Sequence, residues 1–218
     1  MQRQQPQNGI LPVQHLQRAI HDGAISADQA ITAAQLQPAS LDLRLGIDAW
    51  RVQASFLPGG KMTVVDKLAK FAMHKIDLTD GAVLERGCVY IVKLQESLAL
   101  PRGISAMANP KSSTGRLDIF TRLICDHATE FESVAEGYKG PLYAEISPRT
   151  FSVLVRGGSR LSQLRLRQGQ ATVSDDAMHS LHTDVGLVHG DRGTKVDIRD
   201  GVGLTVNLEP DQKSGMIG

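Results

Sequence analysis

Residues 39–52 read ASLDLRLGIDAWRV, and their alternation decides the fold class. Leu41, Leu43 and Leu45 alternate with Asp42 and Arg44, the period of two that arises because successive side chains of a strand point to opposite faces. Short β-rich stretches bordered by Gly or Pro follow at residues 88–94 (CVYIVKL), 142–148 (LYAEISP), 151–158 (FSVLVRGG) and 162–169 (SQLRLRQG). This pattern predicts a compact all-β sandwich or barrel.

A helical spacing precedes the strands. Val13, Leu16 and Ile20 recur at intervals of three and four residues, and the pattern stops at Asp22 and Gly23. One short N-terminal helix is therefore predicted. Residues 65–78 (VDKLAKFAMHKIDL) fit either a helix or a loop inserted between strands.

Composition narrows the class of protein. Hydrophobic residues make up 41% of the 218 residues and charged residues 22%, which is ordinary for a globular chain with a core. The net charge of +1 gives no basic field for general nucleic-acid binding, and no stretch approaches the roughly 18 apolar residues of a membrane span. Cys88 and Cys125 offer neither a disulfide framework nor a CxxC zinc site, so we expect reduced core thiols and a cytoplasmic location.

We expect four segments along the chain. Residues 1–9 are a flexible N-terminus, 10–172 the β domain, and 173–186 a linker. Residues 187–218 read as the start of a second, truncated repeat, because VDIRDGVGLTVNL at 196–208 loosely echoes LDLRLGIDAWRV at 41–52.

A polar cluster interrupts the strands at residues 109–120, which read NPKSSTGRLDIF. Pro110 lacks an N–H and disfavours helix for Asn109, so the chain leaves a strand here. Two hydroxyl groups and two cations on such a turn suit phosphate oxygens, with Lys111 as a point charge and Arg116 as a bidentate fork. An ordinary surface turn is the alternative, and the spacing of a Walker loop is missing.

A single carboxylate, Glu145, lies within the apolar run of residues 142–146. Burying an unpaired charge is costly, so the residue is either paired or functional. With Arg116 as the expected partner, a structural ion pair and a poised general base both remain open.

Several motifs together resemble a known family. They are ASLDLRLG at residues 39–46, the run at 87–120 that contains NPKSSTGR, and GYKGPLYAEISPRTFSVLVRGGSRLSQLRL at 137–166. In this order they resemble the dCTP deaminase branch of the trimeric all-β dUTPase superfamily, and more narrowly its longer bacterial members built from two related halves. The resemblance covers about residues 10–170. It implies a distorted β-barrel or jelly-roll of the dUTPase-like type.

The resemblance also implies a reaction, the hydrolytic deamination of dCTP to dUTP and ammonia in pyrimidine deoxynucleotide metabolism, where dUTP is a dTTP precursor. Glu145 falls on the family's catalytic glutamate, which acts as a general base without a metal. Zinc deaminases need H-x-E and P-C-x-x-C, and neither occurs here. Mg²⁺ is expected only as the partner of the triphosphate, with no protein metal site.

Further residues take roles by the same resemblance. In the family's nucleotide-binding motif the basic residue and one serine contact the triphosphate, while another serine and the Arg organise the base and the attacking water. These positions fall on Lys111, Ser112, Ser113 and Arg116, with Ser112 and Arg116 in catalytic roles and Lys111 and Ser113 in substrate binding. Gln163 resembles a glutamine near the nucleotide. Tyr138 matches an aromatic for which packing and ligand contact are both open.

This chain departs from the family pattern at one turn. The family carries an Asp there that reads the sugar 3′-hydroxyl, and this chain reads VAEGY at 134–138, with Ala135 in its place. The longer segment CDHATEFES at 125–133 offers Asp126 or Glu132 as a substitute carboxylate.

Ala135 also bears on the choice between rival functions. It removes the base that dUTPases of the superfamily use, so a deaminase is favoured over a dUTPase-like diphosphatase. A catalytically idle scaffold half of a tandem protein and a regulator that binds dCTP without turnover are further alternatives. A trimer or pseudo-trimer is expected from the resemblance alone, with active sites between subunits.

Overall fold

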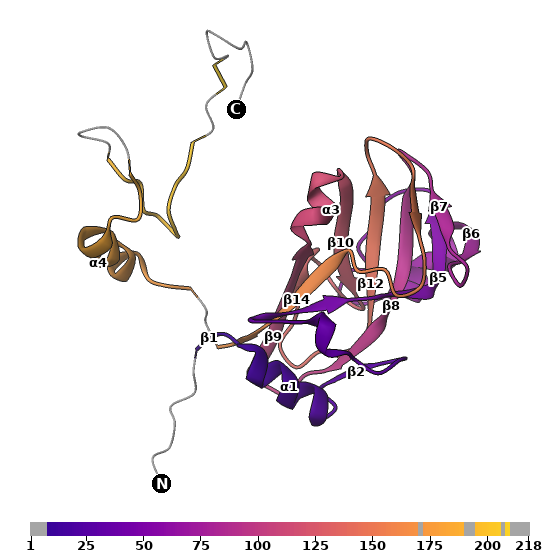
Figure 1. Ribbon diagram of the computed structural model, residues 1–218, viewed down its shortest axis with the longest axis horizontal. Helices are drawn as coiled ribbons and strands as arrows, with labels where there is room; N and C mark the ends of the chain where they lie inside the picture. The colour runs from indigo at the N-terminus through magenta and orange to yellow at the C-terminus, as the bar shows by residue number, and fades with distance from the viewer. Residues whose placement is uncertain (1–7, 170–171, 190–194, 206–207, 210–218) are drawn as a thin grey trace. The chain divides into compact units, whose positions relative to one another are not determined.

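The computed structural model describes residues 8–169, 172–189, 195–205 and 208–209. The chain divides into two compact units, residues 1–171 and 172–218. In the described part of the first unit, two six-stranded sheets and one two-stranded sheet are built entirely from antiparallel pairs. The predicted all-β fold is confirmed (Figure 1).

One sheet has the strand order β11-β9-β14-β4-β3, with β1 paired to β14. Its strands are β1 (Gly9–Ile10), β3 (Leu36–Gln37), β4 (Ser40–Leu43), β9 (Ile104–Pro110), β11 (Ser133–Val134) and β14 (Ser162–Gln168). The other sheet has the order β10-β12-β8-β5-β6, with β2 paired to β8. Its strands are β2 (Ile25–Ala27), β5 (Leu45–Val52), β6 (Ala72–Asp77), β8 (Val89–Ala99), β10 (Ile119–Cys125) and β12 (Lys139–Pro148). Strands β7 (Ala82–Leu84) and β13 (Val153–Val155) form the small sheet.

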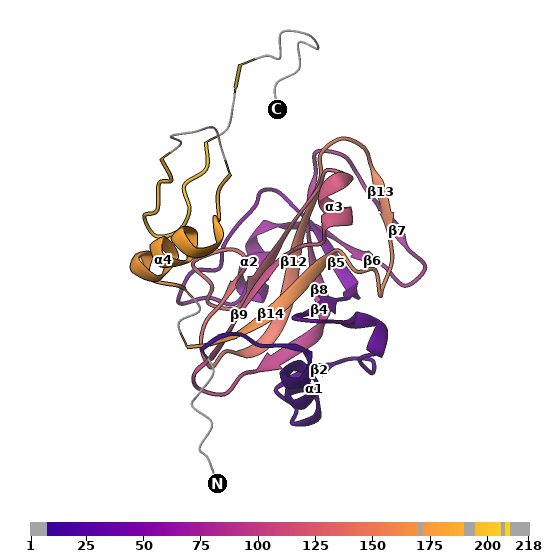
Figure 2. The ribbon, with the colours of Figure 1, turned by 60° about the vertical axis from the view of Figure 1, so that its left-hand side comes forward.

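Three α-helices and a 3₁₀ turn accompany the described strands of this unit. They are α1 (Val13–His21), η1 (Ala33–Gln35), α2 (Val64–Phe71) and α3 (Ser112–Arg116). The predicted N-terminal helix is thus confirmed as α1, which ends at Asp22 before Gly23 with φ +75°. Residues 65–78 are α2 followed by β6. Both views show α1 and α3 at opposite ends of the unit (Figures 1 and 2).

The main core lies between the two large sheets. Leu41, Leu43, Leu164 and Leu166 of one sheet join side chains of the other in a single buried cluster. Burying each leucine contributes roughly 1.5–3 kcal/mol relative to leaving it in water. These leucines are the apolar half of the alternation predicted for β4 and β14, so the inward-facing positions are the expected ones.

A second apolar cluster covers the outer face of the β10-β12-β8-β5-β6 sheet. Helix α2 contributes Val64 and Leu68, which pack with Ile91, Ile124 and Tyr143 of the strands. The neighbouring strand residues Val92, Leu123 and Ala144 belong to the inner core. This sheet is therefore buried on both faces. Side chains that lie on the same face as Tyr143 are on the side of the sheet that α2 covers.

The polar residues here are buried as well, namely Asp42 of β4 and Arg44, which directly follows that strand. Arg44 donates to Glu96 Oε1 at 2.8 Å and to the carbonyl oxygens of Gln29 and Ala30 at 2.7 and 3.1 Å. Glu96 also accepts from the Arg44 backbone N–H and from Gln35. The buried charges are therefore paired and hydrogen-bonded, which is the condition for burying them.

The second unit contains α4 (Asp175–Val185) within the expected linker 173–186. Ser174 caps this helix by accepting from the Ala177 N–H, and Gly186 ends it with φ +67°. An isolated bridge joins Ile198 and Val202. A second repeat at 187–218 stays a prediction, and residues 190–194, 206–207 and 210–218 of it lie outside the described residues. So do residues 1–7 of the expected flexible N-terminus.

In the described ranges, no helix is both long enough and apolar enough to cross a membrane.

Candidate functional site

Glu145 is a buried carboxylate on the outer face of a sheet. It lies on β12, directly opposite Arg122 of β10, and its side chain is 2% exposed. Arg122 donates to Glu145 Oε1 from Nε at 3.1 Å and from Nη2 at 2.5 Å. Glu145 Oε2 is buried and accepts no hydrogen bond from the described residues. One oxygen is therefore fixed and the other is available to a bound molecule.

Within one chain, Glu145 pairs with Arg122 and not with the expected Arg116. Arg122 is the partner because β10 and β12 pair in a register that places the two side chains opposite each other. Arg116 lies at the C-terminal end of α3, exposed to solvent, and forms no ion pair with any described residue. An ion pair across neighbouring strands depends on register, which the spacing of residues in the sequence does not give.

Aromatic rings hold Arg122 in place. Its guanidinium carbon lies 3.5 Å from the ring centroid of Phe131 and 4.8 Å from that of Phe120. A third contact is the 2.9 Å hydrogen bond from Nη2 to Ser55 Oγ. Stacking of this kind restricts the guanidinium group and contributes about 0.5–1 kcal/mol per contact at partly exposed sites. The position of Glu145 Oε1 is thereby defined.

The predicted phosphate motif forms the short helix α3. Ser112, Ser113 and Arg116 are exposed on it, while Thr114 is buried and donates to the Leu161 carbonyl oxygen at 2.8 Å. The backbone N–H of Lys111 donates to the same carbonyl at 2.9 Å. These bonds tie α3 to the residue just before β14 and leave the serine hydroxyls and the Arg116 guanidinium facing solvent.

Lys111 is paired with a buried carboxylate that the sequence did not mark as part of the site. Its Nζ contacts Asp42 Oδ2, and Arg160 Nη1 lies 3.8 Å from the same oxygen. The Asp42 side chain is 2% exposed, and its Oδ1 atom has no hydrogen-bond partner among the described residues. Gln163 lies opposite Asp42 on β14 and accepts from Ser40 Oγ at 3.0 Å. The structure therefore groups Lys111 and Gln163 around Asp42.

Tyr138 is anchored to the backbone. Its hydroxyl donates to the Pro141 carbonyl at 2.7 Å and accepts from the Asp126 N–H at 3.2 Å. Burial raises the pKa of this phenol. The ring packs against the main core. These contacts support the packing role, and contact with a ligand stays a prediction.

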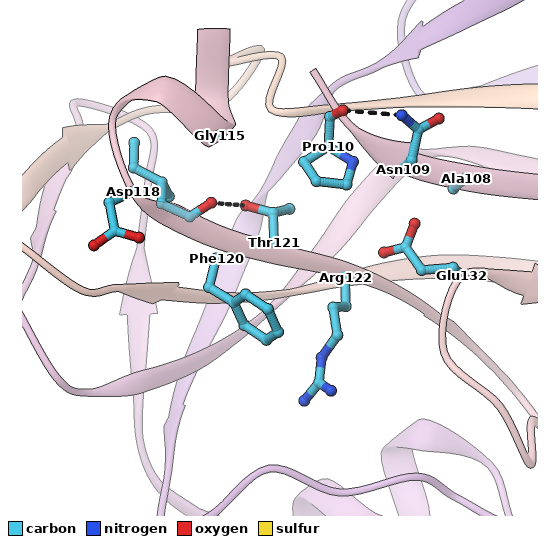
Figure 3. Close-up of a pocket in the computed structure, with 10 residues that line it drawn as sticks. Ala108, Asn109, Pro110, Gly115, Asp118, Phe120, Thr121, Arg122 and Glu132 are labelled. Carbon is cyan, nitrogen blue, oxygen red and sulfur yellow. Dashed lines mark hydrogen bonds between the residues drawn. The ribbon is translucent and has the colours of Figure 1, made fainter. Parts of the chain in front are cut away.

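The two candidate substitutes for the missing carboxylate at Ala135 have different surroundings. Asp126 Oδ1 accepts from the Val64 N–H at 2.7 Å and so caps α2. Glu132 precedes β11 and lines a cavity of about 530 Å³ (Figure 3). Burial raises the pKa of Glu132 to about 7, and a backbone hydrogen bond from Leu123 opposes that shift.

That cavity lies where the edges of the two large sheets meet beside α3. Its walls are Ala108, Asn109, Pro110, Gly115, Asp118, Ile119, Phe120, Thr121, Arg122 and Glu132. Strand β9 supplies one wall and β10 the other, with Glu132 in the connection from β10 to β11 (Figure 3). Arg122 belongs to this wall and its guanidinium binds Glu145, which is not itself a lining residue.

Sequence reasoning missed Arg122 and Asp42. Arg122 is the one charged residue in FTRLIC at 120–125, an apolar strand pattern, and a charge inside such a pattern is a usable signal. Asp42 was noted only for its alternation with the leucines, and no role was assigned to it. Within the described residues, no three His, Cys, Asp or Glu side chains are grouped so that they could hold a metal ion.

Comparisons with known proteins agree on one family. Residues 7–170 match the sequence model of the 2′-deoxycytidine 5′-triphosphate deaminase N-terminal domain. A dCTP deaminase of Halorubrum lacusprofundi is 32% identical over 132 residues, which cover 60% of this chain and 62% of the relative. One of Haloarcula marismortui is 30% identical over 135 residues, which cover 60% and 65%.

A solved structure gives the same result. The crystal structure of 2′-deoxycytidine 5′-triphosphate deaminase from Agrobacterium tumefaciens is 49% identical and superimposes with a TM-score of 0.81. The match covers 97% of this chain and 62% of that one. The chain thus spans a little over three fifths of the length of these relatives.

Proposed function

The chain belongs to the 2′-deoxycytidine 5′-triphosphate deaminase family through its residues 7–170, and we propose that it takes part in the hydrolytic deamination of dCTP to dUTP and ammonia. The observation that carries this proposal is Glu145, a buried carboxylate with one oxygen held by Arg122 and the other without a partner among the described residues. A general base needs such a free oxygen within reach of water.

The proposed chemistry uses water as the nucleophile. Glu145 Oε2 takes a proton from water as the water oxygen bonds to C4 of the cytosine ring, and it passes that proton to N3 of the ring. The second proton of that water passes to the amino nitrogen, the C4–N bond breaks, and ammonia leaves. The water oxygen stays as the C4 carbonyl of dUTP. Arg122 offsets the cost of keeping the Glu145 charge buried throughout.

We propose that α3 acts on the nucleotide of a neighbouring subunit. Ser112, Ser113 and Arg116 are exposed, and Leu117 and Phe120 beside them are 50% and 49% exposed. Exposed apolar side chains next to exposed site residues favour a subunit interface there. A trimer or pseudo-trimer would bring Ser112 and Arg116 of one copy to Glu145 of the next.

The assembly has its own test. Two inactive variants, E145Q and R116A, are mixed after denaturation and refolding together. A shared site regains part of the activity because some interfaces carry both wild-type residues. Mixing that restores nothing contradicts a site built from two copies.

The triphosphate would be bound by Ser113 and Lys111. Lys111 forms an ion pair with Asp42, which partly neutralises the charge of the lysine. Lys111 would therefore both position the loop before α3 and attract phosphate. Gln163, on the neighbouring strand, completes this group. Mg²⁺ would arrive on the phosphate oxygens, because the described residues offer no carboxylate cluster for it.

We also propose a reducing, cytoplasmic compartment and a role in supplying dUTP as a dTTP precursor. The unpaired Cys88 and Cys125 support the compartment.

The test is ammonia release from dCTP and Mg²⁺, beside dUTP, with products separated by chromatography. Conversion of dCTP to dUTP in a one-to-one ratio with ammonia supports the deaminase. Pyrophosphate from dUTP would indicate the dUTPase-like alternative. Binding of dCTP without product would indicate an idle or regulatory half.

A further inference from the structure

Glu132 occupies a backbone conformation that side chains rarely adopt. Its φ is +65°, in the left-handed region, where a residue other than Gly, Asn or Asp is uncommon. Its N–H donates to the Leu123 carbonyl at 3.0 Å, and its carbonyl accepts from the Ala108 N–H at 2.8 Å. The backbone of Glu132 therefore bridges β10 of one large sheet and β9 of the other. These two hydrogen bonds, one to each strand, fix its conformation.

The side chain of Glu132 is fixed at one oxygen only. Its Oε1 atom accepts from the Leu123 N–H at 3.0 Å. Its Oε2 atom is buried and has no hydrogen-bond partner among the described residues. A buried acceptor without a hydrogen-bond partner costs about 1–3 kcal/mol of stability. Such an atom on a cavity wall therefore points to a ligand that would supply the missing donor.

The other polar side chains of the cavity wall already have partners. Asn109 donates to the Pro110 carbonyl at 3.1 Å and accepts from Arg165 at 3.0 Å. Thr121 donates to the Ile119 carbonyl at 3.3 Å. Glu132 Oε2 is thus the buried wall atom that a ligand would satisfy.

Two more side chains complete this comparison. Asp118 accepts from Thr150 at 2.6 Å, and Arg122 binds Glu145. In Figure 3 the Glu132 carboxyl group points toward the space between Asn109 and Thr121, whereas the Arg122 guanidinium points away from it. Arg122 forms no ion pair with Glu132 in the described residues, and its charge lowers the pKa of Glu132 only against the larger effect of burial.

The surroundings define the ligand chemistry. Ala108, Pro110, Ile119 and Phe120 give the cavity apolar walls, and its volume of about 530 Å³ suits a ring of a small molecule. A carboxyl group repels phosphate when it is ionised and accepts a hydrogen bond from an O–H or N–H group. The ligand part that fits is therefore an uncharged ring that carries a donor.

We propose that Glu132 is a specificity-determining residue of the nucleotide site and that its Oε2 accepts a hydrogen bond from an uncharged donor of the nucleotide. This inference rests on the proposed function. The donor is either the sugar 3′-hydroxyl or the amino group of the base. Glu132 takes this role rather than Asp126, whose Oδ1 caps α2 outside the cavity.

The test compares wild type with E132Q on three nucleotides at pH 8. The substitution keeps the size of the side chain and the Oε1 acceptor for Leu123, and it replaces Oε2 with a donor. The nucleotides are dCTP, its 2′,3′-dideoxy form without the 3′-hydroxyl, and dUTP without the amino group. The readouts are kcat/KM for the two cytosine nucleotides and the inhibition constant of dUTP, or Kd values if the chain binds without turnover.

A hydrogen bond to a carboxylate predicts that E132Q loses about 10-fold or more with dCTP. If the sugar hydroxyl is the donor, E132Q and wild type have the same kcat/KM with the dideoxy nucleotide, which lacks that hydroxyl. If the amino group is the donor, E132Q lowers kcat/KM by the same factor for both cytosine nucleotides and leaves the inhibition constant of dUTP unchanged. Either selective pattern supports the inference. Equal losses on all three nucleotides, or no loss on any, overturn it.

The matched control is D126N. Asp126 belongs to the same inserted segment, and its substitution is expected to leave the ratios among the three nucleotides unchanged. Thermal unfolding of both variants checks that they fold. A wild-type chain that binds none of the three nucleotides overturns the proposed function and this inference together. An active wild type with an unselective E132Q overturns this inference alone.

Discussion

Replacing Arg122 with Met should destabilise the β unit strongly, because the substitution leaves Glu145 buried without its counter-charge. The Glu145 side chain is 2% exposed and that of Arg122 26%, so the cation is partly exposed to solvent and the carboxylate is almost fully buried. Removing one partner of a buried pair costs about 3–5 kcal/mol, and the partial exposure of Arg122 places the expected loss near the lower end, about 3 kcal/mol. For a unit of this size the melting temperature should fall by about 6–12 °C.

The assay is urea unfolding of four proteins: wild type, R122M, E145Q and R122M/E145Q. The double variant has no buried charge, so it should be more stable than R122M alone by about 2 kcal/mol, and the two substitutions should be strongly non-additive. R116M is the matched control, because Arg116 is an exposed arginine without an ion pair in the described region. The free energy of unfolding of R116M should stay within about 0.5 kcal/mol of the wild-type value.

Two results would refute this reasoning. Additive effects of R122M and E145Q would show that the two side chains are not coupled. An R116M variant as unstable as R122M would restore the pairing expected from the sequence.

Three further predictions concern the carboxylates. E145Q should lower turnover by about 10²–10⁴-fold and keep nucleotide affinity within a few-fold, which calorimetry with dCTP measures; a large loss of affinity instead would give Glu145 a binding role. The raised pKa of Glu132, about 7 against an ordinary 4.5, means that the folded chain favours the protonated form. Wild-type stability should therefore fall as pH rises from about 4.5 to about 7, and urea unfolding at pH 5 and 8 should show no such fall for E132Q; parallel curves would place Glu132 in contact with water. D42N should cost about 2 kcal/mol in unfolding free energy, since it removes the counter-charge of Lys111; an unchanged urea midpoint would argue against that ion pair.

The strands follow from local pattern, and the site does not. Leu41, Leu43 and Leu45 predicted an inward face, and all three are buried in the main core. The same alternation gave no sign that Asp42 is buried, because its partner Lys111 precedes α3, far along the chain, and only the fold brings the two together. Long-range pairing is a property of sheet order, which no local period encodes.

The partner of Glu145 shows the same limit. Arg116 was expected to pair with Glu145 because it belongs to the motif that resembles the family. Arg122 lies six residues further along, in β10 and outside that motif. The register of β10 with β12 selects Arg122. Likewise, Asp126 and Glu132 were equivalent in the sequence, and the fold distinguishes them: Asp126 accepts from the Val64 N–H, whereas Glu132 lines the cavity.

The most direct measurement of the central claim is ammonia release from dCTP by the wild-type chain beside E145Q at equal concentration. We expect ammonia and dUTP in a one-to-one ratio from wild type, and a rate at least about 10²-fold lower from E145Q with dCTP still bound. Equal rates from the two proteins would remove Glu145 from the chemistry and contradict the account.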